Sequence, residues 1–155
     1  MQLEMKIVND DVLNKLKQAG SVFEEAAGAF LKKSGLMVVS IAGQKAPRDK
    51  GTLGSSISAG EVKKTAGTLE IPVGTNVDYA PHHEFGTGIY GKNNAPITPK
   101  RAKMLRFVIK GGQVVYARSV KGVPAKKFMQ QGIEFVEQNV ETAFAEADKI
   151  IQRKL

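Results

Sequence analysis

Three neighbouring ionisable side chains, His82, His83 and Glu84, are the residues of this chain that could do chemistry most directly. Imidazole and carboxylate groups bind zinc and can also act as general bases. Consecutive residues rarely point at one ion, however, and the i, i+4 spacing that brings two helical histidines to one metal is missing. A base also needs a nucleophile and an orienting acid that converge in space, and the sequence shows no such set. We therefore expect no catalytic residue, no metal and no cofactor, and keep a metal-dependent enzyme as a third hypothesis.

A glycine motif follows at once. Residues 86–91 satisfy the spacing G-x-G-x-x-G, in which glycines let the backbone approach a pyrophosphate at the start of a helix. No β-prone run directly precedes the motif, and residues 92–96, which end in Pro96, should not continue as a helix. We interpret these glycines as part of a mobile loop and not as a dinucleotide site.

Positive charge dominates the next part of the chain. Between Glu84 and Glu134 there are ten Lys or Arg residues and no Asp or Glu. Such a segment favours an electropositive surface, which attracts phosphate backbones or acidic proteins. Two interpretations stay open: a surface that contacts DNA phosphates without reading sequence, and an ordinary solvated face. The candidate DNA-facing or acidic-partner surface consists of Lys100, Arg101, Lys103, Arg106, Lys110, Arg118 and Lys121.

Length and composition limit what can surround these residues. The chain has 155 residues, of which 42% are hydrophobic, so we expect one domain over residues 1–155. A net charge of +8 bears on partners and not on the fold. The absence of Cys excludes disulfides and thiolate zinc sites. No apolar run approaches the roughly 18 residues that cross a bilayer, and no signal-peptide core begins the chain, so we expect a soluble intracellular product and no membrane partner.

Two long helices and two hairpins are predicted. Apolar residues recur at helical spacing from about residue 10, and Ala46-Pro47 should end that helix. Residues 53–64 and 68–74 read as one β-hairpin, and residues 104–109 and 114–118 as another, closed by Gly111-Gly112. Residues 75–102 read as a long loop. After Pro124 an apolar stripe predicts a closing helix with an acidic opposite face.

This order of elements predicts an α+β fold. A small, mostly antiparallel sheet of two hairpins would carry the long N-terminal and C-terminal helices on one face. The edges of such a sheet would remain available to partners.

The spacing of several short motifs resembles a phage family. Ala46-Pro47, the segment 51–57, Val73-Gly74-Thr75 and the segment 79–87 together resemble the tail-completion, or head–tail joining, proteins of tailed bacteriophages, which are minor tail components of the neck. The resemblance covers about residues 10 to 150. Residues 88–123 depart from it, because the family commonly has a short link there, whereas this chain has a basic hairpin insertion. The candidate assembly motif is Gly51, Leu53, Ser56, Tyr79, Ala80, Glu84, Phe85, Gly86 and Thr87.

The resemblance implies a structural virion protein and no enzyme. It implies a ring of identical protomers, such as a hexamer, in the neck of the virion, with neighbouring neck and tail proteins as partners and a passage for DNA that allows non-specific contact. The protein would be made in the host cytoplasm. Tyr79 would pack on the helices and Glu84 would cap a helix or pair across protomers, and the alternative is that this segment stabilises only its own fold.

Charge suggests how such protomers could meet. The acidic last helix, with Glu137 and Glu141, could contact the basic hairpin of a neighbour, and we expect charge reversal at both residues to weaken assembly. The main alternative function is a basic, sequence-independent DNA-binding module that uses residues 92–127.

Overall fold

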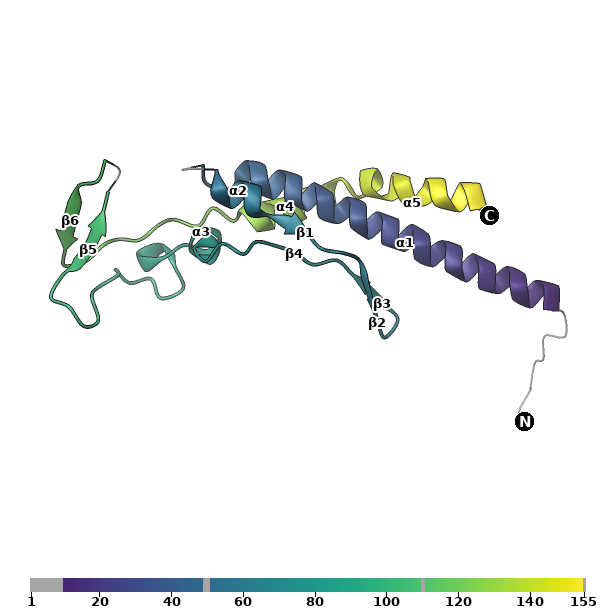
Figure 1. Ribbon diagram of the computed structural model, residues 1–155, viewed down its shortest axis with the longest axis horizontal. Helices are drawn as coiled ribbons and strands as arrows, with labels where there is room; N and C mark the ends of the chain where they lie inside the picture. The colour runs from purple at the N-terminus through teal and green to yellow at the C-terminus, as the bar shows by residue number, and fades with distance from the viewer. Residues whose placement is uncertain (1–9, 49–50, 110, 155) are drawn as a thin grey trace, which may run out of the picture.

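One long helix runs along most of the molecule. The computed structural model describes residues 10–48, 51–109 and 111–154 (Figure 1). Helix α1 (Asp10–Lys45) has 36 residues and is therefore about 54 Å long at 1.5 Å per residue. It ends before Pro47, as predicted. Its most buried apolar residues are small or β-branched, and they are Val22, Ala26, Val38 and Ala42.

Two shorter helices, α4 (Phe128–Gln138) and α5 (Val140–Lys154), lie along α1 in the opposite direction (Figure 1). The sequence predicts one closing helix, and the structure divides it at Asn139. The backbone of Asn139 leaves the helical conformation, with a φ of −124°, and its side-chain amide donates to the carbonyl of Phe135 at 2.8 Å. Packing of α5 on α1 includes an edge-to-face contact of Phe30 and Phe144, with ring centroids 6.3 Å apart.

The helical character of α1 raises the question of a membrane. Residues 17–45 are long and apolar enough to cross a bilayer by length and hydropathy alone, so the expectation that no segment comes near this limit is wrong by that measure. A core helix of a soluble protein passes the same test. Here α1 packs against α4, α5, α2 and the strands β1, β3 and β4.

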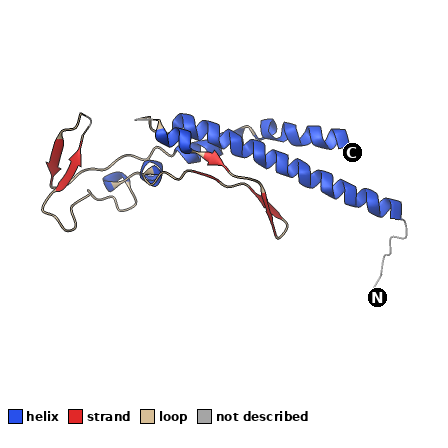
Figure 2. Cartoon of the chain, in the orientation of Figure 1, coloured by secondary structure: helices blue, strands red, loops and turns tan. Residues whose placement is uncertain are grey.

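The strands of the described residues form three separate two-stranded antiparallel sheets (Figure 2). Strand β1 (Ser58–Ala59) pairs with β4 (Val73–Gly74), and β2 (Lys63–Thr65) pairs with β3 (Thr68–Glu70) through the predicted turn at Ala66-Gly67. Strand β5 (Leu105–Val108) pairs with β6 (Val114–Ala117) as the second predicted hairpin.

The predicted α+β class is confirmed, with its long N-terminal helix, its C-terminal helices and its small antiparallel hairpins. The predicted layering differs from the structure. Strands β1, β3 and β4 pack under α1, whereas the β5–β6 hairpin lies at the far end of the molecule, away from the helices (Figure 1). The segments before β5 and after β6 run outward from α3 and α4, so the hairpin does not reach α1 (Figure 1).

Two segments predicted as strand or loop are helical. Residues 53–56 belong to α2 (Thr52–Ser56), because Leu53 inserts under α1 and the hydroxyls of Ser55 and Ser56 donate to carbonyls three residues earlier. Within the expected long loop, α3 (Ala80–Phe85) starts with Pro81 in its first turn and ends at Gly86, and the 3-10 turn η1 (Gly88–Tyr90) follows.

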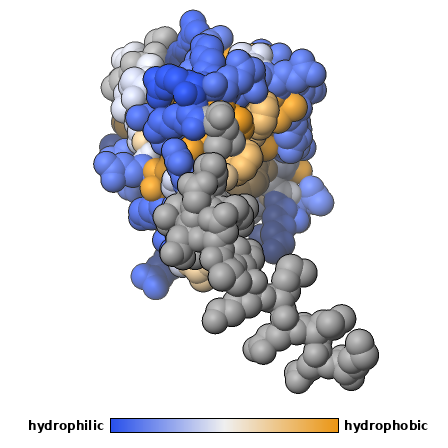
Figure 3. Space-filling model, turned by 90° about the vertical axis from the view of Figure 1, so that its right-hand side faces the viewer, coloured by the Kyte–Doolittle hydropathy of each residue, from blue (hydrophilic) through white to orange (hydrophobic). Residues whose placement is uncertain are grey.

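The core lies where α1, α2, α3 and α4 meet. It contains Ala42, Ala46, Leu53, Ile57, Ala80 and Phe128. Away from this core the outside of the helices is largely hydrophilic, with apolar side chains visible between the charged ones in the view along the long axis (Figure 3). The core therefore fixes α3 against α4, and that contact positions the site described next.

Candidate functional site

Glu84 holds the start of α4. Its Oε2 accepts a hydrogen bond from the backbone N–H of Met129 at 2.9 Å, and its Oε1 accepts one from Gln130 at 3.1 Å. The residue at the N-cap position of α4, Lys127, provides no side-chain cap and has a φ of 51°. A carboxylate at a helix N-terminus satisfies free N–H groups and interacts favourably with the helix dipole. Glu84 is 8% exposed, so this cap is internal, in agreement with one of the two roles expected for it.

Backbone contacts extend the junction on both sides of Glu84. Lys126 N–H donates to the carbonyl of His83 at 2.7 Å, and Lys127 N–H donates to the carbonyl of Glu84 at 3.2 Å. Thr87 N–H donates to Val123 O at 2.8 Å, and Thr87 Oγ1 accepts from the N–H of Val123 at 2.9 Å. We call residues 83–89 together with residues 121–130 the clamp. It holds together the two ends of residues 88–123, which we call the arm.

The glycines of the G-x-G-x-x-G motif serve this clamp. Gly86 has a φ of +74°, and a Cβ there would lie 2.8 Å from Tyr90 O and 2.9 Å from Ala125 N. Gly88 has a φ of +64°, and a Cβ there would overlap the carbonyl of Lys121. Because the chain's own backbone fills the space that a pyrophosphate would need, the glycines allow a close approach of two chain segments and not of a nucleotide.

The earlier residues of the candidate assembly motif lie in the core or beside it. Gly51 has a φ of +76° and starts α2, and Leu53 is 2% exposed in the core. Ser56 Oγ lies 2.6 Å from Thr75 Oγ1, which links α2 to the segment after β4. These residues and Ala80 therefore stabilise the body that carries α3.

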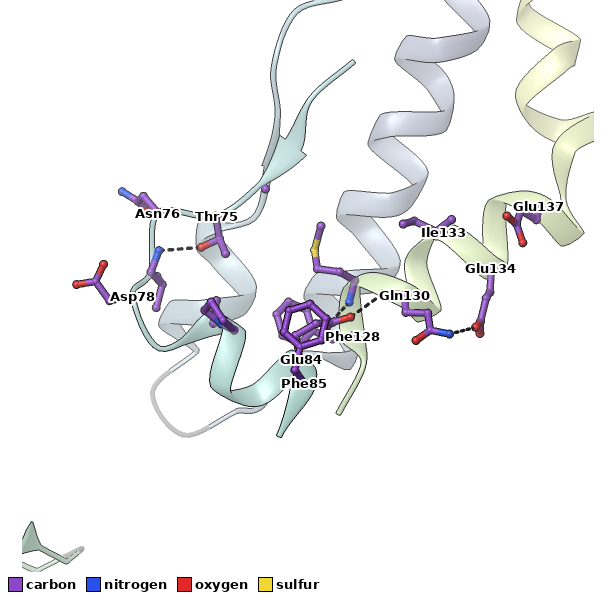
Figure 4. A pocket seen from close by; sticks show the side chains of 15 residues that line it. Thr75, Asn76, Asp78, Glu84, Phe85, Phe128, Gln130, Ile133, Glu134 and Glu137 are labelled. Carbon is purple, nitrogen blue, oxygen red and sulfur yellow. Dashed lines mark hydrogen bonds between the residues drawn. The ribbon is translucent and has the colours of Figure 1, made fainter. Parts of the chain in front are cut away.

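Two aromatic members of the motif face outward. Tyr79 is 44% exposed and makes an edge-to-face contact with His83 of α3. Phe85 is 72% exposed. Phe85 lies beside an open hollow of about 890 Å³ between the segment 74–78, α3 and α4, which we call the groove (Figure 4).

The groove is apolar inside and acidic at its rim. Phe85, Phe128 and Ile133 contribute apolar surface, and Asp78, Glu134 and Glu137 contribute carboxylates (Figure 4). Among the described residues that line it, none is Lys or Arg. Sequence reasoning missed Ile133 as a surface residue, because it belongs to the apolar stripe of the last helix. The width of that stripe could have indicated a surface residue, because α1 covers only part of the stripe and leaves Ile133 half exposed.

The predicted basic residues all lie on the arm. The side chains of Lys100, Arg101, Lys103, Arg106, Arg118 and Lys121 are exposed, and Lys110 lies outside the described residues. Within the described part of the chain the ion pairs are Lys64–Glu24, Lys149–Glu146 and Lys154–Glu25, and none involves the arm. The arm therefore presents its positive charge to solvent.

The three residues considered for metal or acid–base chemistry do not converge. The carboxylate of Glu84 caps α4, His82 is exposed, and His83 packs against Tyr79. Over residues 10–48, 51–109 and 111–154, no group of three or more His, Asp and Glu side chains is placed to hold a metal ion. The arrangement is suited to joining chain segments.

Comparison with known proteins found one family similar to the N-terminal half of the chain. A family model described as "Bacteriophage HK97-gp10, putative tail-component" matches residues 10–86. Those residues resemble the HK97-gp10-like family. Comparisons with curated proteins and with solved structures found no match. The predicted resemblance to a phage tail family is therefore confirmed, although the match is shorter than the expected residues 10 to 150.

The match to the HK97-gp10-like family supports a role as a tail component of a bacteriophage, and hence a place in the virion. A structural family of this kind favours a role without catalysis. The match contains α1, α2, the first two sheets and α3, and it ends at Gly86, within the first segment of the clamp. The arm, α4 and α5 lie beyond it.

Proposed function

We propose that this HK97-gp10-like protein completes the tail at the head–tail neck, where it assembles as a ring around the DNA passage. The observation that carries this proposal is the arm. It extends from the body at the clamp and exposes apolar side chains and positive charge that the described part of the chain leaves unpaired (Figure 1). Exposed apolar surface of this kind is typical of assembly interfaces. The family match supplies the context of a phage tail.

The proposal includes the organisation of the chain. Residues 1–155 form one tail-completion-like domain, and residues 88–123 are an insertion in it. Support comes from the clamp, because Ile89 N–H donates to Lys121 O at 2.8 Å and the two ends of the arm are thereby adjacent. An insertion can be added at such a point without changing the body.

Partners follow from the same reasoning. A closed ring uses heterologous contacts, in which each protomer offers two different surfaces. Of the candidate assembly motif, we assign the outward-facing Tyr79 and Phe85 to contacts with neighbouring protomers or neck and tail proteins. The internal members, such as Leu53 and Glu84, act by holding the body in shape. Assembly would take place in the host cytoplasm.

A second candidate function is a sequence-independent DNA-binding module. The arm favours it, because residues 88–123 contain Lys and Arg but no Asp or Glu. Phosphate contacts release counterions, so such binding weakens steeply as salt rises, whereas a ring held by buried apolar surface does not.

Light scattering of the purified protein separates the two functions. Mass would be measured at low and high salt, with and without duplex DNA. We expect a ring that persists at high salt and is indifferent to DNA. A monomer that binds DNA only at low salt would contradict the neck function and support the second candidate. A monomer that ignores DNA would contradict self-assembly of the free protein.

A further inference from the structure

The β5–β6 hairpin has one apolar face without a partner. In its register Arg106 lies opposite Tyr116 and Val108 lies opposite Val114. Directly opposite residues of an antiparallel pair, and residues two apart on one strand, point to the same side. These side chains therefore form one face, on which Tyr116 is 60% exposed and Val108 is 57% exposed. On the other face, Leu105, Val115 and Ala117 are partly covered, and Phe107 is 37% exposed.

An isolated hairpin of this kind is barely stable in water. Among the described elements, β5 and β6 make their substantial contacts with each other, and Figure 1 shows the hairpin at the end of the molecule opposite to the C-terminus of α5. At the base of the arm, Ile97 and Val120 form a single antiparallel bridge, which leads the chain outward from the clamp. A partner that covers the exposed face would bury the apolar surface that the monomer leaves in water.

The groove has the complementary chemistry. It offers the apolar side chains of Phe85 and Ile133, and Ile133 is 51% exposed. Its rim is acidic, and Gln130 donates to Glu134 at 2.8 Å, which holds that carboxylate beside the opening (Figure 4). An acidic rim repels nucleic acid and attracts a basic segment.

We propose that the groove of one protomer receives the hairpin face of the arm of a second copy of this chain. Tyr116 and Val108 would pack against Phe85 and Ile133, and Arg106 would face Glu134 and Glu137. The inference rests on the proposed ring and names the two surfaces that form it. Each copy offers one arm and one groove, which is the heterologous arrangement that closes a ring.

A cysteine pair tests the contact directly, because the chain has no Cys of its own. Two full-length proteins would be made, one with Tyr116→Cys and the other with Ile133→Cys and a mass tag. They would be mixed at high concentration under mild oxidation, and the mixed disulfide would be followed by mass. The control pair replaces Ile133→Cys with Thr142→Cys, an exposed position on α5 outside the groove. We expect the groove pair to react about ten-fold or more faster, because docking raises the effective concentration of the two thiols.

Charge reversal gives a second readout. Glu134→Lys with Glu137→Lys on the groove protein should slow the reaction to the control rate, and Arg106→Glu on the arm protein should restore part of it. Circular dichroism checks that each variant is folded, and Arg106→Glu alone, on the exposed hairpin, should slow the reaction even if the groove variant misfolds.

Three results would overturn the docking proposal. They are equal rates for the groove and control pairs, a rate unaffected by both sets of charge reversal, and suppression of the reaction by duplex DNA, which would assign the arm to DNA. Failure of the two proposals remains distinguishable by light scattering. If a ring forms but the groove pair does not cross-link, the docking proposal is wrong and the ring proposal stands. If the groove pair cross-links but light scattering shows no ring, the docking proposal stands and the ring proposal is wrong.

Discussion

The carboxylate of Glu84 replaces a cap that α4 lacks at its own N-terminus. Lys127 precedes the helix in a left-handed conformation, and its positive charge is unfavourable near the positive end of the helix dipole. Both oxygens of Glu84 accept N–H groups of the first turn, so one side chain satisfies two donors and adds a favourable charge. The same side chain fixes the distance between the two walls of the groove.

Substitution of Glu84 should therefore lower stability. We expect Glu84→Gln to cost about 1 kcal/mol of unfolding free energy, because the charge is lost and one acceptor oxygen remains. Glu84→Ala should cost about 2 kcal/mol, because two N–H groups are left unpaired in a partly buried position. Urea unfolding followed by circular dichroism measures both.

The matched control for Glu84 is Glu134→Gln. Glu134 is exposed at the groove rim, so its substitution should change stability by less than about 0.5 kcal/mol. Equal losses for Glu84→Gln and Glu134→Gln would refute the assigned role of Glu84.

For single residues, the sequence indicated which side chains matter but not what they contact. The Tyr79–Thr87 segment stood out, and a capping role for Glu84 was one of two expectations. Its partners could not be predicted, because Met129 is 45 residues away and no local spacing connects them. The 44% exposure of Tyr79 could not be predicted either, because it depends on which surfaces the rest of the chain covers.

Among the elements, the crossing of α4 on α1 depends on the absence of one side chain. Gly132 is buried on α4, and a Cβ there would lie 2.9 Å from Val38 O and 3.4 Å from the Cβ of Ala42. The two helices can therefore approach closely at this point, and α4 is held where its free side forms the groove wall.

Alanine at two glycines should consequently have opposite effects. Gly132→Ala should destabilise the protein by about 1 to 2 kcal/mol, because overpacking against the backbone of α1 outweighs the gain in helix propensity. Gly20→Ala should stabilise it by up to about 1 kcal/mol, because its Cβ would meet nothing within 4 Å. Urea unfolding gives both signs, and a stabilising Gly132→Ala would show that the crossing is looser than described here.

Long elements, in which apolar residues recur regularly over many turns, were predictable from the sequence, and short elements were not. Helix α1 ended at its predicted residue because Pro47 acts locally. Helix α2 has five residues, and burial of Leu53 under α1 overrides the strand-like pattern of the segment. The division at Asn139 is a change of backbone conformation at one residue, with a φ of −124°, which the apolar stripe does not encode.

The molecule as a whole consists of a helical body and an arm that leaves it at one point. Its two hairpins were predicted individually, but their separation was not, because turn signals specify pairing within a hairpin and say nothing of which surface the hairpin packs on. The exposed strands of the arm show that the chain carries more apolar surface than it can cover itself.

Removal of the arm should leave the body intact. Residues 98–119 would be replaced by Asn-Gly, which joins Ile97 to Val120 across their existing bridge by a two-residue turn. We expect the unfolding free energy to change by no more than about 0.5 kcal/mol, because the entropy cost of closing a loop depends only weakly on its length. Self-assembly should be lost. Urea unfolding and light scattering of the same preparation measure the two effects.

The two outcomes of arm removal are independent. Unfolding of the shortened protein would show that the arm is part of the core, and full assembly without the arm would show that the ring is built from other surfaces.

The clamp also sets the order of events during translation. The wall of the groove that contains Phe85 is synthesised before the arm, and the wall that contains Ile133 is synthesised after it, with 46 residues separating Glu84 from Gln130. A ribosome therefore exposes the arm before the receiving groove exists on the same chain. In the proposed docking, a nascent protomer cannot accept a neighbour until α4 has emerged and folded onto Glu84, so the clamp must close before the groove can receive an arm.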